Sequence, residues 1–169
     1  WNLKLKDEIR NKEIIQKKLK QSEEKFRTLF DIAPILLDAF DDDRKVILWN
    51  KECEKVFGWS LEEIQKEKNP ISLLYPDTLI QKEIFEDFQN NDGNIYKEWH
   101  PITKDGKEII TRWANIQLPN DEIIHVGYDI TQQRKNEKIV QEKTEQLKIA
   151  KQQLEELNSS LENRIESEI

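Results

Sequence analysis

The residues of this chain that could do chemistry are few and lie far apart. Histidine occurs twice, as His100 and His125, and Cys53 is the single cysteine. His100 precedes a proline within a predicted strand, and His125 lies in the last predicted strand. We therefore interpret both as ordinary surface or strand histidines. One cysteine and two separated histidines cannot be assembled into a zinc site with typical ligand spacings.

The sequence contains no motif typical of an enzyme. It has no Gly-rich phosphate loop and no nucleophile elbow. We therefore predict that the chain is not an enzyme, with no catalytic residue and no metal site. A lone cysteine also excludes an intramolecular disulfide, which indicates a reducing, cytosolic setting.

The distribution of charge excludes one class of partner. The net charge is −7, and residues 31–131 hold eleven Lys or Arg against twenty-one Asp or Glu. A nucleic-acid-binding protein needs a basic face, so this acidic centre argues against a nucleic acid partner. No apolar run approaches the roughly 18 residues of a membrane span. We expect a membrane connection only through segments upstream of residue 1, because the chain lacks an initiating Met and starts with a basic, Trp-led helix.

The hydrophobic periodicity predicts three parts. Residues 1–30 are predicted to form an N-terminal helix with a half-polar heptad seam, and Pro34 prevents this helix from continuing. Residues 31–131 form a core, and residues 132–169, which contain no Gly or Pro, form one long connector helix. At Thr131 the apolar period changes from two to about 3.6, and Thr is a good N-cap residue.

Within the core, the pattern alternates between strands and short helices. Two apolar runs at 35–40 and 46–49 flank an acidic turn, which predicts a β-hairpin. Helices are predicted at 52–57, 60–66, 71–75 and 77–89. Strands are predicted at 95–103, 107–118 and 121–130, joined at turn residues such as Asp105-Gly106. This order predicts an α+β fold, a five-stranded antiparallel sheet with its short helices on one face.

The connector helix carries a heptad pattern. Apolar residues repeat every seven positions, while Lys143 and Arg164 interrupt the second row of the seam. This pattern predicts a parallel coiled-coil homodimer of limited stability. The predicted dimer seam is Val140, Leu147, Ala150, Leu154, Leu157 and Leu161.

Two segments of the core resemble a PAS domain. The first runs from Ala39-Phe40-Asp41 through Trp49-Asn50 to Phe57-Gly58-Trp59-Ser60, with Arg44 in place of the usual turn glycine. The second runs from Glu98-Trp99-His100 to Gly127-Tyr128-Asp129-Ile130-Thr131. The resemblance covers about residues 22–131 and implies the PAS fold.

The flanking helices extend this resemblance to bacterial signalling proteins. Residues 21–30 are similar to a common entry into bacterial PAS domains, and residues 154–166 are similar to the connector before the dimerisation domain of sensor histidine kinases. The resemblance implies a cytoplasmic sensory domain of a two-component phosphorelay that regulates a downstream kinase domain. Two alternatives remain open: a diguanylate cyclase as output, or a dimerisation and spacer module that binds no ligand.

The resemblance also bears on cofactors. PAS domains can hold haem, flavin or small metabolites between the sheet and the helices. The haem type carries its axial histidine on the long helix, and residues 77–89 contain none. The photoactive flavin type needs a cysteine after the second short helix, and Cys53 lies too early. We therefore expect neither haem nor a flavin adduct, and leave the choice between a small metabolite and no ligand open.

Two sets of site residues follow from these arguments. The core contains many aromatic residues for its size. These residues either fill the interior or form a cage around a ligand, and we favour the first interpretation. The candidate pocket residues are Ile47, Trp49, Asn50, Phe57, Leu74, Phe85, Trp99 and Trp113. The resemblance assigns signal transfer to Asp129 and Thr131, at the joint between core and connector helix.

Overall fold

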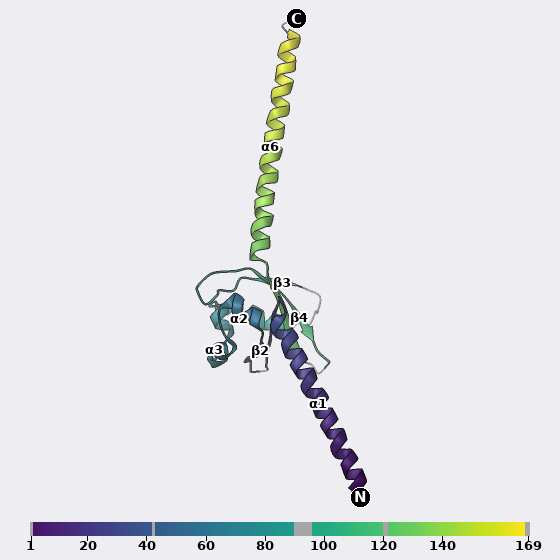
Figure 1. Ribbon diagram of the computed structural model, residues 1–169. Coiled ribbons are helices and arrows are strands. Elements are labelled where there is room, and N and C mark those ends of the chain that lie inside the picture. Colours follow the sequence, from purple (N-terminus) through teal and green to yellow (C-terminus); the bar gives the residue numbers. More distant parts are fainter. Residues whose placement is uncertain (1, 42, 90–95, 120–121, 168–169) are drawn as a thin grey trace. The chain divides into compact units, whose positions relative to one another are not determined.

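The computed structural model describes residues 2–41, 43–89, 96–119 and 122–167. The chain divides into two compact units, residues 1–129 and residues 130–169. The first unit contains helix α1 and the mixed core, and the second is formed by helix α6 (Figure 1). Among the described residues, no helix carries an apolar stretch long enough to cross a membrane.

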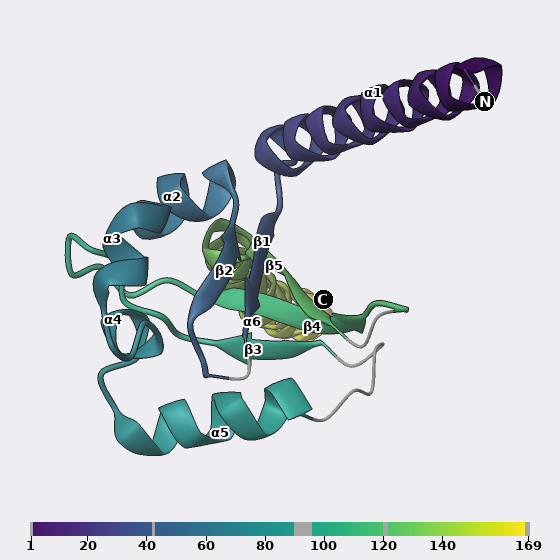
Figure 2. The same cartoon turned by 90° about the horizontal axis from the view of Figure 1, so that it is seen from below.

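Five strands form one antiparallel sheet with the order β2-β1-β5-β4-β3. The strands are β1 (Leu36–Phe40), β2 (Val46–Trp49), β3 (Lys97–Trp99), β4 (Thr111–Gln117) and β5 (Ile123–Asp129). Figure 2 shows the four short and medium helices grouped on one side of this sheet. The predicted α+β fold, with five antiparallel strands and long terminal helices, is confirmed.

Local signals set the ends of most helices. Helix α1 (Asn2–Ile32) ends two residues beyond the predicted boundary and just before Pro34. Helix α2 (Lys51–Phe57) ends at Gly58, whose φ of 80° is the left-handed conformation that glycine adopts without strain. Helix α3 (Leu61–Lys66) starts with the predicted capping box of Ser60 and Glu63.

Helix α5 (Thr78–Gln89) begins as predicted, because the Asp77 side chain accepts a hydrogen bond from the Leu79 amide at 2.7 Å. Its buried face is narrower than expected. Ile84 is buried, but Leu79 is 71% exposed and Ile80 is 37% exposed. Helical spacing from Ile84 predicts burial of these two residues, but both lie at the exposed start of α5, which follows the four-residue helix α4 (Ile71–Leu74).

Strand β3 is shorter than the predicted 95–103. Beyond Trp99 the chain reaches Pro101, which has no N–H to donate to a ladder. The Ile102 amide then donates to the Leu74 carbonyl at the end of α4, at 2.8 Å, instead of to the sheet. The predicted hairpin is kept where β3 pairs antiparallel with β4, and beyond this ladder it continues as a single bridge between Ile102 and Glu108.

A β-bulge in strand β2 decides which of its residues face the interior. The ladder pairs Ala39 with Leu48 and Phe40 with Val46, so Ile47 has no partner in β1. The extra residue reverses the alternation of side chains. Val46 and Trp49 are therefore both buried, whereas Ile47 is 44% exposed.

The side chain of Asn50 joins three elements and is fully buried. Its Nδ2 donates to the carbonyl of Phe30 in α1 at 3.1 Å and to the carbonyl of Ile35 before β1 at 2.8 Å. Its Oδ1 accepts from the amide of Leu37 in β1 at 3.2 Å and from the amide of Cys53 in α2 at 3.0 Å. Asn50 thus uses both donors and both acceptors of its amide.

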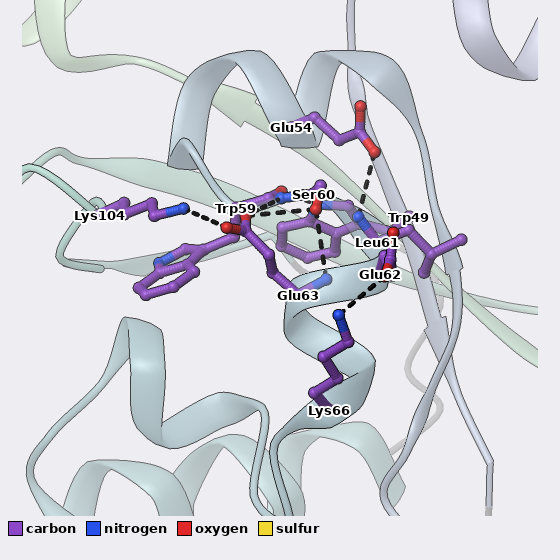
Figure 3. A network of polar contacts seen from close by, with 9 residues as sticks. All are labelled: Trp49, Glu54, Trp59, Ser60, Leu61, Glu62, Glu63, Lys66 and Lys104. Atoms are coloured by element: carbon purple, nitrogen blue, oxygen red, sulfur yellow. Dashed lines mark hydrogen bonds and ion pairs between the residues drawn. The ribbon is translucent and has the colours of Figure 1, made fainter.

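The loop between β3 and β4 is fastened to α2 and α3 through Lys104 (Figure 3). The Lys104 backbone amide donates to the Phe57 carbonyl at 2.8 Å. The Lys104 ammonium lies 2.5 Å from Oε1 of Glu63 and 4.7 Å from the centre of the Trp59 ring. The hydrogen bond from Lys104 lowers the pKa of Glu63 to about 2, assisted by the Ser60 backbone amide. Because these groups are solvent-exposed, the network orients the loop and adds little stability.

Helix α6 (Thr131–Ser167) is 37 residues long. The Ile130 carbonyl accepts the first helical hydrogen bond, from the Arg134 amide at 2.8 Å. Since the N-cap is the residue whose carbonyl accepts this bond, the cap falls at Ile130, and Thr131 is the first helical residue instead of the cap. The boundary differs from the predicted one by a single residue.

The Asn50 network generates the first prediction. Asn50→Ala should lower the free energy of unfolding by about 3 kcal/mol, because two carbonyls and two amides lose a buried partner. Urea unfolding followed by circular dichroism measures this loss. The matched control is Asn11→Ala on the exposed surface of α1, which should change stability by less than about 0.5 kcal/mol. Equal effects of the two substitutions would contradict the assigned role of Asn50.

Candidate ligand cavity

A small, partly open cavity of about 30 Å³ lies between the sheet and helices α4 and α5. Strands β1, β3, β4 and β5 supply one wall, and the two helices supply the other. A water molecule in the liquid occupies roughly this much room, so the cavity accommodates about one water in this conformation. The lining residues are Asp38, Phe40, Ile71, Leu74, Tyr75, Ile84, Asp87, Phe88, Trp99, Trp113, Asn115 and His125.

The most distinctive polar feature of the lining is the buried pair of Asp38 and His125. Nδ1 of His125 lies 2.7 Å from Oδ1 of Asp38, and the two side chains are 4% and 8% exposed. Strands β1 and β5 place these residues directly opposite each other. Burial raises the pKa of Asp38 above its ordinary value, and the hydrogen bond to His125 opposes part of this rise.

Aromatic rings hold the imidazole in place. The Phe88 ring stacks on His125 with centroids 3.8 Å apart and an interplanar angle of 18°. Phe40 contacts the imidazole at a centroid distance of 5.7 Å. Nε2 of His125 is buried and has no hydrogen-bond partner within the described part of the chain. The imidazole of His125 is therefore hydrogen-bonded to Asp38 at Nδ1, whereas Nε2 has no partner among the described residues.

A second polar cluster connects the cavity to helix α5. Nδ2 of Asn115 in β4 donates to the backbone carbonyl of Asp87 at 2.8 Å. Lys97 in β3 forms an ion pair with the Asp87 carboxylate. Together these contacts attach the C-terminal half of α5 to two strands and compensate the charge of Asp87.

A third group of polar contacts surrounds Thr111, which is fully buried in β4. Its hydroxyl accepts from Nε1 of Trp113 at 2.9 Å and donates to the Trp99 carbonyl at 3.2 Å. Burial raises the pKa of Tyr75, and a hydrogen bond to Thr111 opposes this rise. Tyr75, which lines the cavity, therefore stays un-ionised.

Cys53 lies in helix α2 with no exposed surface. Burial and the nearby Asp38 carboxyl raise the pKa of its thiol, which donates to the Leu37 carbonyl at 3.5 Å. A thiol that stays protonated is a poor nucleophile and a poor metal ligand. Cys53 therefore acts as a small core residue.

The structure brings together only part of the candidate pocket set. Leu74, Trp99 and Trp113 line the cavity. Trp49, Asn50 and Phe57 are buried elsewhere in the core. Phe85 lies under the guanidinium of Arg44, and Ile47 points away from the core because of the bulge in β2.

The prediction for His125 as an ordinary surface or strand histidine was wrong in its main point. His125 lies in a strand, but it is 3% exposed and paired with Asp38. Apolar residues alternate at Ile124, Val126 and Tyr128, and this alternation places His125 on the other face of the strand. In the structure those residues lie on the opposite, more exposed face, and His125 points inward. Its partner is 87 positions away, so no local pattern revealed the pair.

Comparison with known structures gives the fold its name. The PAS domain of an HTR-like protein from Haloarcula marismortui is 13% identical with a TM-score of 0.54, and the match covers 70% of this chain and 99% of that domain. The PAS domain of a Colwellia psychrerythraea protein is 24% identical with a TM-score of 0.50, covering 68% and 98%. The chain has the PAS fold.

A third similar structure is a domain of the sensory box sensor histidine kinase/response regulator from Geobacter sulfurreducens. It is 16% identical with a TM-score of 0.52, and the match covers 66% of this chain and 96% of that domain. No protein-family model matches the sequence, and no curated protein does. The similarity of this chain to these proteins is therefore a similarity of fold.

The cavity also sets a size limit on cofactors. A tetrapyrrole or a flavin ring does not fit into about 30 Å³ in this conformation. Helix α5 offers no histidine to an iron, and the Cys53 side chain is absent from the cavity lining. The residues present thus fit neither haem held from α5 nor a cysteinyl flavin adduct.

The buried acid generates the second prediction. Between the ordinary Asp pKa of 3.8 and the raised pKa of Asp38, the folded protein holds a proton that the unfolded chain has released. Stability should therefore fall as pH rises through this window, by about 1.4 kcal/mol for each unit of the rise in pKa. Asp38→Asn should remove the fall.

Urea unfolding between pH 4 and pH 7 measures this difference for the wild type and Asp38→Asn. Repeating the comparison in a His125→Gln background removes the titration of the imidazole. If the free energy of unfolding depended on pH in the same way with Asp38 and with Asn at position 38, both with His125 and with Gln at position 125, burial of Asp38 would not destabilise the folded protein as pH rises.

Proposed function

We propose that this chain is the sensory PAS segment of a cytoplasmic signalling protein, with a histidine kinase as the favoured output. The observation that supports this proposal most strongly is the direct connection between the core and the connector helix. Strand β5 ends at Asp129 and helix α6 begins at Thr131, so Ile130 alone separates them. A displacement of β5 therefore reaches α6 without passing through a flexible loop.

The cavity supports an input to this pathway. His125 lies on β5 itself, four residues before Asp129. A ligand or a proton that changes the Asp38–His125 pair would act on the strand that leads into α6. Coupling energies of about 1–3 kcal/mol are typical of such linked sites, and one charged hydrogen bond in a buried pair is of this size.

The flanking helices support a dimeric output. The proposed seam residues of α6 are exposed in the single chain, with Leu147 71% exposed and Leu154 58% exposed. Helix α1 exposes a similar set, including Ile15, Leu19 and Phe26. Long helices with such apolar rows are stabilised by pairing with a second copy. We therefore propose a parallel homodimer held by these helices, which would transmit a change in angle or register.

The nature of the output domain belongs to this proposal too. The similar Geobacter domain comes from a sensor histidine kinase/response regulator, and residues 154–166 are similar to connectors in such kinases. A diguanylate cyclase follows comparable coiled coils and is the alternative output. If the intact protein has an upstream membrane segment, this chain would be its cytoplasmic part.

The competing proposal is a dimerisation and spacer module whose core binds nothing. The small volume of the cavity favours this alternative, whereas the unsatisfied His125 Nε2 favours a ligand. The two differ in whether substitutions in the cavity change the output of the intact protein.

The seam generates the third prediction. Leu147→Asp combined with Leu154→Asp should shift the chain from dimer to monomer, because two charges would enter an apolar interface. Sedimentation equilibrium measures the change, which should weaken dimerisation at least about a hundredfold. The matched control places Asp at Gln152 and Ser159, two positions off the seam on the same helix, and should remain dimeric. A dimer that persists in the seam variant would contradict assembly through α6.

The joint generates the fourth prediction. Asp129→Ala in the intact kinase should change basal autophosphorylation, because Asp129 is the last residue of β5 and Ile130 alone separates it from the start of α6. It should leave core stability within about 1–2 kcal/mol of the wild type. Glu83→Ala, on the exposed surface of α5, is the control and should leave autophosphorylation unchanged. Should Asp129→Ala alter neither basal activity nor the response to a stimulus, the signal-transfer role of Asp129 would have to be abandoned.

A further inference from the structure

The Asp38–His125 pair is a buried acid and base in a cavity whose described lining holds no permanent cation. Nδ1 of His125 lies 2.7 Å from Oδ1 of Asp38, and the two side chains are 4% and 8% exposed. None of the described residues that line the cavity is Lys or Arg. A buried carboxylate is costly unless its charge is compensated, so the compensation at this site must come from a proton that the pair takes up. The pair is therefore a candidate binding site for a proton.

The other titratable groups around the pair are already compensated or un-ionised. From α5, Asp87 lines the cavity, and its carboxylate forms an ion pair with Lys97 of β3. After the end of α4, burial raises the pKa of Tyr75, and in α2 burial and the nearby carboxyl of the pair raise the pKa of the Cys53 thiol. The lining residues from β4 carry no charge. Among the described residues at this cavity, the pair is thus the group whose charge is left to change near neutral pH.

The number of protons on the pair decides what Nε2 of His125 can do. When the pair holds an extra proton, one proton lies between Nδ1 and Oδ1 and another is on Nε2, which is then a donor. When the extra proton leaves to solvent, the remaining proton stays on Nδ1, where it donates to the Asp38 carboxylate, and Nε2 becomes an acceptor. This step changes the overall charge of the pair from zero to one negative charge.

The cavity can satisfy both of these states. Nε2 has no partner among the described residues, and the partly open cavity of about 30 Å³ has room for about one water. A water accepts a hydrogen bond from a protonated Nε2 and donates one to a bare Nε2. One exchangeable water therefore suits the imidazole in either state, and the site needs no larger ligand.

Loss of the proton changes the connection between two strands. Asp38 belongs to β1 and His125 belongs to β5, and the ladder places them opposite each other. The protonated pair is neutral overall, whereas the deprotonated pair leaves an uncompensated negative charge between the two strands, which is costly in a buried site. A rise in pH should therefore loosen the hold of β1 on β5, the strand that leads into α6.

We propose that the Asp38–His125 pair is a proton-binding site through which pH sets how firmly β1 holds β5. The proposal rests on the sensory function proposed above and assigns the proton as its stimulus. Histidine is the side chain whose ordinary pKa places its change of charge between about pH 5 and 8. Because the two groups are coupled, the titration step belongs to the pair and not to either residue alone.

The two histidines of the chain serve as probe and internal reference. The protein is labelled with ¹⁵N-histidine, and the ring nitrogens are followed by NMR between about pH 5 and 9. Nε2 of His125 should gain one proton as the pH falls, with the change of chemical shift of a nitrogen that becomes protonated. Constant shifts of both His125 nitrogens over this range would overturn the proposal.

Two substitutions compare the buried pair with an exposed one. Asp38→Asn should lower the pH of proton uptake at His125 by at least about one unit, because the imidazolium would be buried without a negative partner. Glu108→Gln is the matched control, since Glu108 lies 3.5 Å from His100 and both side chains are exposed. The control should shift the titration of His100 by less than about 0.7 unit and that of His125 not at all. An unchanged midpoint at His125 in folded Asp38→Asn would contradict the proposal, and if this variant does not fold, the wild-type titration decides.

Amide hydrogen exchange measures the effect on strand pairing. Protection factors, which correct for the intrinsic pH dependence of exchange, should fall about fivefold or more for the β1–β5 amides as the pair loses its proton. The β3–β4 ladder, which does not contain the pair, should change less. In His125→Gln, the difference between the two ladders should no longer depend on pH. A β1–β5 ladder whose protection does not follow the titration of the pair would also overturn the proposal.

These outcomes differ from a failure of the sensory function. If the pair takes up a proton and the β1–β5 ladder follows it, but autophosphorylation of the intact kinase depends on pH in the same way in the wild type and in His125→Gln, the proton-binding site stands and the sensory role fails. If the pair takes up no proton but Asp129→Ala alters autophosphorylation, the sensory role stands and the proton-binding site fails.

Discussion

The pairing of Asp38 with His125 depends on the register between β1 and β5. The cavity depends on this register too, because both residues line it. The ladder sets these residues opposite each other, with Leu37 facing Val126 and Leu36 facing Gly127. A slip of one residue would move each side chain to the other face of the sheet. On the other side of β5, Gly127 lies against the ring of Trp113 in β4, where a Cβ would come within 2.5 Å, so packing restricts the position of β5 relative to β4.

The sequence predicted those features that depend on neighbouring residues. The period of two and the turn residues predicted the sheet, and the capping box at Ser60 and the glycine at position 58 predicted helix ends. The five-stranded α+β fold followed from the order of these elements. Each of these signals lies within a few residues, so one sequence is enough to read it.

The features that the sequence did not reveal depend on residues far apart in the chain. Ile47 was a pocket candidate, but the bulge that turns it outward appears only when β2 pairs with β1. Leu79 is exposed although it lies at helical spacing from the buried Ile84, and His125 is buried beside Asp38, 87 positions away. Asn50 was placed in the pocket, but its four bonds to α1, β1 and α2 make it a structural junction. These outcomes are set by tertiary packing, which a hydrophobic period does not encode.

The central claim is that the buried histidine on β5 controls the helix that follows this strand. The most direct measurement compares autophosphorylation of the intact protein carrying His125→Gln with that of His100→Gln. The account predicts that His125→Gln changes the basal rate or abolishes the response to a stimulus, in a protein that remains folded, while His100→Gln behaves as the wild type. Wild-type behaviour of both folded variants would contradict the claim and leave the core as a spacer.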